Sequence, residues 1–405
     1  MGFIDCDTHV LENEDTWSYL AKNELQYKPV KVQMPAAPPG AVKRAPAPPV
    51  SIWLMGDTWV TAAPLDGNMR NNANKYLDGV ADLTNLGGRI EDMDSLGIDV
   101  QLLLSTFYLG AELDNPAAEV ALARSYNRWM ADHVRPEYRA RLPWAVRAPM
   151  RSIPEAIKEL NFGKENGAAG IQVRGLEHAM YLTDSFFEPL WQHVNDLEMG
   201  VFVHLGEATR RIDGQSLGRT IANPASMMRQ LFPLMAGFHA VIASDFEKRY
   251  PNIRWGFLEG GSSWIPTVLQ MDTRLRASAD EFLRHRPLSH DALEEKQVFI
   301  AVETDDALDH LSAAVGENIL VVGTDYGHND RGTELGAHSV IQAREDVDAG
   351  LAKKIVDSSG RRLLGIKEDF TPAPAPSGLG KVPHVQGAST PDGKPILVHK
   401  IVSRV

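Results

Sequence analysis

The sequence has a single cysteine, no long run of like charge and no apolar segment of membrane-spanning length. One cysteine excludes a disulfide framework within the chain and fits a reducing compartment. The chain carries 41 Lys and Arg against 53 Asp and Glu, a net charge of −12, without a clustered basic stretch. We therefore expect no general nucleic-acid binding. No stretch approaches the ~20 apolar residues of a membrane helix, and no leader-like segment opens the sequence. These absences predict a soluble cytoplasmic protein.

The one cysteine, Cys6, lies within the first apolar run of the chain. We interpret it as a small core residue rather than a nucleophile, because free cysteine is among the most buried residue types. With no second thiol, a structural zinc cluster built on thiolates is excluded.

Short apolar strands alternate with amphipathic helices along most of the chain. Residues 89–97 show the unit, because an amphipathic helix stops at Gly97 and an apolar strand follows at 99–105. Further strands are expected at 3–7, 142–148, 169–174, 200–204, 253–259, 297–302 and 319–322, and further helices at 117–134, 153–166, 186–197, 227–250, 264–284 and 305–315. Eight βα units predict an α/β fold that closes as a (β/α)8 TIM barrel.

Four of these strands end on side chains that can bind a metal. These side chains are Asp7 and His9 on the first strand, His204 on the fifth, Glu259 on the sixth and Asp325 on the eighth. The C-terminal ends of barrel strands meet at one face, where active sites lie. Each residue alone has an ordinary explanation, because Asp325 can cap a turn and an Asp-x-His pair can bond backbone amides. Together they predict a metal site.

The alternation of side chains along a strand predicts which polar residues of the first strand share a face. Asp7 and His9 are two residues apart, so an extended segment places them on the same side. Asp5 shares the parity of Asp7 and lies deeper, so we expect it to have a packing or supporting role.

Four motifs surround these strand ends, and they stand in chain order. They are Ile4-Asp5-Cys6-Asp7-Thr8-His9, Phe202-Val203-His204-Leu205-Gly206, Phe257-Leu258-Glu259-Gly260-Gly261-Ser262-Ser263-Trp264-Ile265-Pro266 and Gly323-Thr324-Asp325-Tyr326-Gly327-His328. Jointly they resemble the amidohydrolase-2 group of the metal-dependent amidohydrolase superfamily. That group includes aminocarboxymuconate-semialdehyde decarboxylase and the resorcylate and carboxyvanillate decarboxylases. The resemblance runs from residue 1 to about 366, apart from residues 23–74.

The resemblance implies one divalent metal ion held by Asp7, His9, His204 and Asp325. Asp7 departs from the His or Glu of several members, and its shorter arm must come nearer the ion. Glu259 stands where the muconate-type decarboxylase has a catalytic His, so that proton relay does not carry over, and Glu259 is kept as a candidate catalytic residue. Two imidazoles and two carboxylates suit Zn²⁺ or Mn²⁺ better than a Ca²⁺ cage.

The expected activity is non-oxidative decarboxylation of a small aromatic or diene carboxylic acid by a metal-dependent carbon–carbon lyase. A protonated acid must then deliver H⁺ to carbon, a role open to Asp325 or Glu259. The alternative is a hydrolase that opens a lactone, amide or ester with a metal-bound water and uses either carboxylate as base. A barrel that binds ligand without turnover is disfavoured, because every ligand position is filled.

Three further residues are candidates for the site. His328 follows the last motif and can assist the neighbouring carboxylate or contact substrate, or it can be a surface histidine. Arg174 ends the fourth strand and can pair with a substrate carboxylate, or with Glu177 or Asp184 in a structural ion pair. Trp264 opens a helix and can wall the substrate pocket or belong to the core.

Two stretches fall outside the βα pattern. Residues 23–74 are rich in proline and are expected to form an insertion, with a hairpin at 51–60, that acts as a lid or dimer arm. Residues 367–405 are expected to form a Pro/Gly-rich tail after one catalytic domain at 1–366. Both stretches favour a homodimer or higher homo-oligomer with exchanged arms.

Overall fold

A barrel of parallel strands forms the centre of the molecule. The computed structural model describes residues 2–34, 50–55, 58–61, 78–206, 224–279, 288–328 and 332–371. The barrel strands are β1 (Ile4–Val10), β5 (Val100–Ser105), β6 (Trp144–Val146), β7 (Ala168–Arg174), β10 (Gly200–His204), β11 (Arg254–Leu258), β12 (Val298–Val302) and β13 (Leu320–Val322). They form one eight-stranded sheet in chain order, with parallel neighbours. The predicted (β/α)8 barrel is confirmed.

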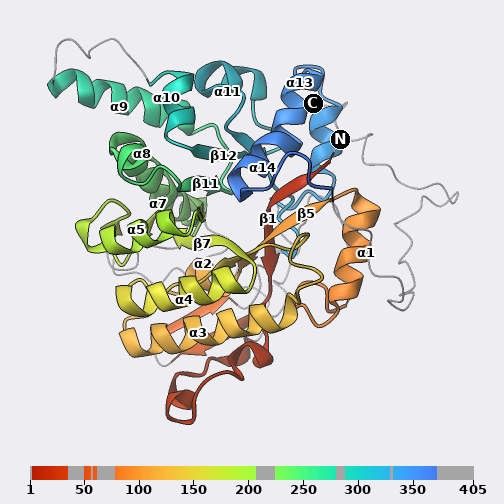
Figure 1. Ribbon diagram of the computed structural model, residues 1–405, viewed down its shortest axis with the longest axis vertical. Coiled ribbons are helices and arrows are strands. Elements are labelled where there is room, and N and C mark those ends of the chain that lie inside the picture. The colour runs from red at the N-terminus through yellow and green to blue at the C-terminus, as the bar shows by residue number, and fades with distance from the viewer. Residues whose placement is uncertain are drawn as a thin grey trace, which may run out of the picture.

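Helices surround the strands (Figure 1). They are α1 (Leu86–Leu96), α2 (Phe107–Gly110), α3 (Pro116–His133), α4 (Ile153–Glu165), α5 (Glu188–Asp196), α7 (Pro224–Ala243), α8 (Phe246–Arg249), α9 (Ile265–Ala279), α10 (His290–Glu295), α11 (Leu308–Val315), α12 (Ala337–Gln342), α13 (Ala349–Lys353) and α14 (Ser359–Leu364). The sequence signals of α1 act as expected. The Asn85 side chain caps its start by accepting from the amide of Gly88, and Gly97 ends it in the left-handed region at φ 71°.

Alternate strand residues fill the barrel interior. Phe202 of β10, Leu258 of β11 and Val321 of β13 belong to one buried apolar cluster. Leu363 of α14 joins this cluster, so α14 packs against the interior residues of the barrel. Cys6 is fully buried in the same cluster, which confirms its interpretation as a core residue.

A β-bulge interrupts the alternation of β1. Asp5 pairs with Gln101 and Thr8 pairs with Leu103, so two residues of β1 oppose one residue of β5. His9 then pairs with Leu104, which belongs to the interior cluster. The expectation that Asp5 shares the face of Asp7 is therefore wrong, because the bulge changes the parity between them. Asp5 instead bonds Thr324, whose hydroxyl donates at 2.6 Å.

The insertion at 23–74 contains a small sheet in its described part. β2 (Val30–Met34), β3 (Val50–Met55) and β4 (Thr58–Thr61) form three antiparallel strands. The hairpin expected at 51–60 is confirmed as β3 and β4. Trp53 of β3 is fully buried and its ring meets that of Trp17 edge to face, with centroids 6.0 Å apart. This contact packs the small sheet onto the main apolar core.

Some expected boundaries differ. The single helix expected at 227–250 divides into α7 and α8, because the Ser244 hydroxyl bonds the carbonyl of Val241 and ends the first helix. The helix expected at 305–315 starts only at Leu308, because Asp306 uses its carboxylate to accept from the Glu303 amide at 2.9 Å.

Several expectations lie beyond the described structure. Most of the tail expected at 367–405 is outside the described residues, as are parts of 23–74. The homo-oligomer and the domain division stay predictions. No helix within the described residues is long and apolar enough to cross a membrane.

Candidate metal centre

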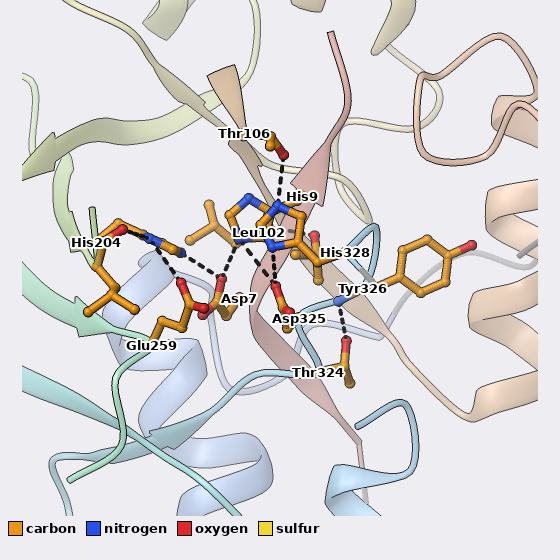
Figure 2. A network of polar contacts seen from close by, with 12 residues as sticks. Asp7, His9, Leu102, Thr106, His204, Glu259, Thr324, Asp325, Tyr326 and His328 are labelled. Carbon is orange, nitrogen blue, oxygen red and sulfur yellow. Dashed lines mark hydrogen bonds and ion pairs between the residues drawn. The ribbon is translucent and has the colours of Figure 1, made fainter. Parts of the chain in front are cut away.

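The strand ends bring the predicted ligands together at one buried place (Figure 2). Asp7 and His9 come from β1, His204 ends β10, and Asp325 and His328 lie in the loop after β13. Their exposed fractions lie between 0% and 5%. Two groups among them could hold an ion, with ligand atoms within 4.8 Å of one another: Asp7, His9 and His204, and His9, Asp325 and His328. His9 is common to both groups.

Asp7 links the two imidazoles of the first group. Its Oδ1 lies 3.2 Å from His9 Nε2 and 3.1 Å from His204 Nε2. Burial acts to raise the pKa of the Asp7 carboxyl, but the two histidines outweigh it and hold that pKa below its ordinary value. Asp7 is therefore a carboxylate at neutral pH, the form that binds metal.

His204 is oriented by a backbone carbonyl. Its Nδ1 lies 2.8 Å from the oxygen of Leu205, and a carbonyl only accepts, so Nδ1 carries hydrogen in this contact. Nε2 then faces Asp7 with either a proton or a lone pair. Burial lowers the pKa of His204, but the charge of Asp7 outweighs it and raises that pKa. The raised pKa favours a proton between His204 Nε2 and Asp7 Oδ1, two ligand-type atoms, and a divalent cation can replace such a proton.

His9 is held by ring packing rather than by hydrogen bonds. Both of its ring nitrogens are buried, and neither makes a hydrogen bond to any described residue. Burial, followed by the nearby His328, lowers the pKa of His9 well below its ordinary value. A neutral imidazole without a hydrogen-bond partner is costly to bury. Its Nε2 faces Asp7 and Asp325, so a metal ion there would satisfy it.

Asp325 has a constrained backbone and two fixed oxygens. Its φ is 55°, in the left-handed region that costs a non-glycine residue about 1 kcal/mol or more. Oδ1 lies 3.5 Å from His9 Nε2 and 2.7 Å from His328 Nδ1. Oδ2 accepts from the hydroxyl of Thr333 at 2.9 Å. The carboxylate is thereby aimed at the two imidazoles.

His328 lies in the cluster and not on the surface. Its Nε2 is 2.9 Å from the hydroxyl of Thr106, at the end of β5. Its ring stacks on that of His9, with centroids 3.7 Å apart. The interpretation of His328 as a surface histidine is excluded by its 2% exposure.

Glu259 lies beside His204 on the other side. Its Oε2 is 3.5 Å from His204 Nδ1, and its φ of 59° repeats the left-handed conformation of Asp325. The turn after it is fixed by Asp306, whose carboxylate accepts from the amide and hydroxyl of Ser262 at 3.0 and 2.7 Å. Two acidic strand ends therefore share the same strained backbone, a feature that concentrates at functional sites.

Comparisons with known proteins identify the family of this chain. A family model described as amidohydrolase matches residues 4–366. The chain belongs to the amidohydrolase family. A comparison with curated proteins gives no match.

Solved structures share the fold at low sequence identity. An amidohydrolase from Mycobacterium avium subsp. paratuberculosis is 18% identical, with a TM-score of 0.69 over 91% of this chain and 99% of that one. A 5-carboxyvanillate decarboxylase from Novosphingobium aromaticivorans, complexed with manganese, is 16% identical, with a TM-score of 0.54 over 74% and 85% of the two chains. A dihydroxybenzoic acid decarboxylase from Polaromonas, with bound manganese and 2-nitroresorcinol, is 18% identical, with a TM-score of 0.53 over 68% and 85%.

Two predicted site residues lie outside the cluster of candidate metal ligands. Arg174 is the neighbour of His204 across the β7–β10 pairing, but its Nη2 donates to Glu177 at 2.6 Å and its Nη1 to the carbonyl of Ala111 at 3.2 Å. The structural pairing expected as its alternative is thus present. Trp264 packs edge to face on Phe238 within the main apolar core and donates to a backbone carbonyl.

Two supporting residues were missed from the sequence. Thr106 directly follows an apolar strand, the same signal that identified the other strand ends, and could have been found by it. Thr333 lies eight residues beyond Asp325 in a loop, where no local pattern marks it.

Proposed function

We propose that this chain is a metal-dependent decarboxylase, a carbon–carbon lyase, of a small aromatic or diene carboxylic acid. The observation that carries the proposal is the buried pair of Asp325 Oδ1 and His328 Nδ1, 2.7 Å apart, beside the candidate metal ligands. Support comes from amidohydrolases of the same fold that are named decarboxylases and contain manganese.

The donor set of the cluster suits Zn²⁺ or Mn²⁺. Imidazole nitrogens and carboxylate oxygens are contributed by Asp7, His9, His204 and Asp325. When bound, such an ion supplies Lewis acidity to oxygen atoms of the substrate. We propose these four residues as its ligands because His9 Nε2 faces the carboxylate oxygens of Asp7 and Asp325 at 3.2 and 3.5 Å without forming a hydrogen bond of good geometry to either.

The Asp325–His328 pair supplies the proton that decarboxylation requires. Loss of CO₂ breaks a carbon–carbon bond and leaves the electron pair on carbon, where one proton must be added. Thr106 fixes the imidazole of His328 and Thr333 fixes the carboxyl of Asp325, so the pair can hold a proton at a defined position. Burial of both groups keeps bulk water away from the carbanion-like carbon.

Glu259 is the second proposed proton carrier. It lies beside Nδ1 of His204, whereas Asp7 lies beside Nε2 of the same ring. Recognition of the substrate carboxylate by Arg174, and a pocket wall from Trp264, stay proposals. A carboxylate bound at Arg174 would share this guanidinium with Glu177.

Metal content tests the centre first. Protein purified without added metal would be measured by elemental mass spectrometry beside Asp325→Asn and the surface control Asp309→Asn, whose side chain is 50% exposed. We expect about one equivalent of Zn or Mn in the wild type and the control, and a loss of it in Asp325→Asn. A metal-free wild-type protein would contradict the proposal.

Product analysis then separates the lyase from a hydrolase. Small aromatic and diene carboxylic acids, and lactones, amides and esters of such acids, would be screened for CO₂ release in ¹⁸O-labelled water. Decarboxylation gives CO₂ and an organic product without ¹⁸O. Cleavage of a lactone, amide or ester with ¹⁸O in the new carboxyl group, and no CO₂, would replace the proposal with the hydrolase.

A further inference from the structure

The barrel closes at a seam between β1 and the segment that follows β13, and the candidate metal ligands Asp7, His9 and Asp325 lie on it. Strand pairing runs continuously from β1 to β13, whereas the contact that closes the circle is an isolated bridge between Thr8 and Tyr326. The Asp325 amide donates to the carbonyl of Asp7 at 2.9 Å, and the His9 amide donates to the carbonyl of Tyr326 at 2.6 Å. Both backbone bonds connect one ligand-bearing segment to the other.

Arg89 of α1 reaches into this seam. It is fully buried, and its Nη1 donates to the carbonyl of His9 at 3.0 Å while its Nη2 donates to the hydroxyl of Thr8 at 3.0 Å. Its Nε donates to the side chain of Gln101 on β5 at 2.9 Å. One planar guanidinium thus fixes the end of β1 to its neighbour, in a geometry that an ammonium group cannot reproduce.

The same helix contacts the other side of the seam. The guanidinium carbon of Arg89 lies 4.6 Å from the centre of the Tyr326 ring. The hydroxyl of that ring donates to Asp92 Oδ2 at 2.7 Å, three residues further along α1. Figure 2 shows the Tyr326 ring directed away from the imidazoles, so the residue contributes to the site through its backbone. The helix therefore contacts the segments that carry His9 and Asp325.

We propose that Arg89 and Asp92 are positioning residues, which hold the two sides of the seam at the spacing where His9 and Asp325 bind one metal ion. The proposal rests on the metal centre proposed above. Arg89 acts through the Tyr326 ring and the backbone carbonyl of His9, and Asp92 acts through the Tyr326 hydroxyl. Groups that orient ligands in this way typically change metal affinity by about 10–100-fold when removed.

The positions of His9 and Asp325 must be fixed accurately relative to each other, because the two ligands come from segments that are far apart in the sequence. His9 Nε2 and Asp325 Oδ1 are 3.5 Å apart, and metal-ligand distances tolerate only about 0.2 Å. Asp325 also holds its left-handed backbone only while its surroundings enforce it. A small slip at the seam would separate the ligands while the barrel remained folded.

Mn²⁺ binding to the full-length apoprotein tests the proposal. Free Mn²⁺ would be counted by electron paramagnetic resonance for the wild type, Arg89→Lys and Tyr326→Phe, with Tyr19→Phe as the matched control. Tyr19 also donates its hydroxyl to an aspartate, Asp132, at 2.6 Å, but this aspartate lies on α3 and not on α1. Melting of each apoprotein would be recorded in parallel.

We expect the Kd for Mn²⁺ to rise about 10–100-fold in Arg89→Lys, to rise about 10-fold in Tyr326→Phe, and to stay unchanged in Tyr19→Phe. Each tyrosine variant loses one Tyr–Asp bond, and Tyr326→Phe should lose more apoprotein stability than Tyr19→Phe because its bond is partly buried. Wild-type affinity in both seam variants, or equal weakening in Tyr19→Phe, overturns the proposal and leaves the metal centre intact. Absence of Mn²⁺ binding by the wild type overturns both. If Arg89→Lys does not fold, the two tyrosine variants decide the outcome.

Discussion

His9 and His328 lie face to face, with ring centroids 3.7 Å apart and planes 14° from parallel. Both rings direct a nitrogen toward Oδ1 of Asp325. Two cationic imidazoles at this separation would repel strongly, and His328 is, after burial, the main cause of the lowered pKa of His9. His9 is therefore neutral, which is the form that binds a metal. The proposed proton carriers are therefore His328 and Asp325.

The first prediction concerns His328→Gln. Glutamine keeps a polar side chain beside Thr106 but cannot carry a proton, so kcat should fall about 10²- to 10⁴-fold. Metal content should stay at the wild-type level, because the four proposed ligands, Asp7, His9, His204 and Asp325, are untouched. Steady-state kinetics and elemental analysis measure the two quantities. The control is His310→Gln, at a side chain 87% exposed, which should behave as wild type. Loss of metal in His328→Gln would make His328 a ligand instead.

A second prediction concerns the hydroxyl that fixes this ring. Thr106→Val keeps the shape of the side chain and removes its bond to His328 Nε2. We expect kcat to fall about 10-fold, the order of one lost hydrogen bond to a catalytic group. In the double variant with His328→Gln the two losses should not add, because both changes act on one interaction. Additive losses would show that Thr106 acts independently of His328.

The sequence predicted the barrel because its strands are short, apolar and punctuated by glycine, as at Gly97. It also predicted the cluster, since the ends of parallel strands meet at one face whatever the side-chain detail. The face of Asp5 was mispredicted because a bulge depends on pairing with β5, which strand alternation alone does not encode. The partnership of Arg174 with Glu177 was one of two open alternatives, and only the packed geometry shows it.

The other features that the sequence did not predict depend on contacts between distant parts of the chain. β2 was missed because its partner β3 lies across a proline-rich stretch, and antiparallel pairing of distant segments has no local pattern. The seam contacts of Arg89 were invisible for the same reason. Its helix could be predicted from residues 89–97, but its burial against His9 depends on closure of the whole barrel.

The third prediction concerns the pH dependence of stability. Glu12 is 2% exposed, and burial raises its pKa from 4.5 to about 7, although Ser105 and the amide of Phe107 bond its carboxylate. The pKa of Glu12 is higher in the folded state than in the unfolded state. The stability that the protonated Glu12 contributes is therefore fully present below pH 4.5. It is lost as the pH rises through 7. The loss attributable to Glu12 should reach about 3 kcal/mol in the free energy of unfolding.

Urea unfolding at pH 5 and pH 8 measures this effect. Glu12→Gln mimics the protonated acid, since its amide can donate to Ser105 and accept from the Phe107 amide. The variant should lose less stability than the wild type between the two pH values. Burial also raises the pKa of Asp5 to about 7. The Glu12→Gln variant should therefore keep part of the loss in the free energy of unfolding between pH 5 and pH 8. If both proteins lost the same free energy of unfolding between the two pH values, ionisation of Glu12 would not destabilise the folded state.

The last prediction concerns Gly323, which lets the loop after β13 pass against β1. A Cβ at this position would overlap the Cβ of Asp7 and lie 2.9 Å from its Cα and amide nitrogen. The neighbouring backbone cannot move without shifting a candidate ligand, so Gly323→Ala should lower the free energy of unfolding by about 1–3 kcal/mol and weaken metal binding. Gly336→Ala is the matched control, because its Cβ would meet only the Glu334 carboxylate at 3.5 Å and its φ of −93° suits alanine. Urea unfolding and Mn²⁺ titration of the two variants measure both effects. If Gly323→Ala binds Mn²⁺ like Gly336→Ala, then Asp7 is either not a ligand or free to move from its place beside the seam.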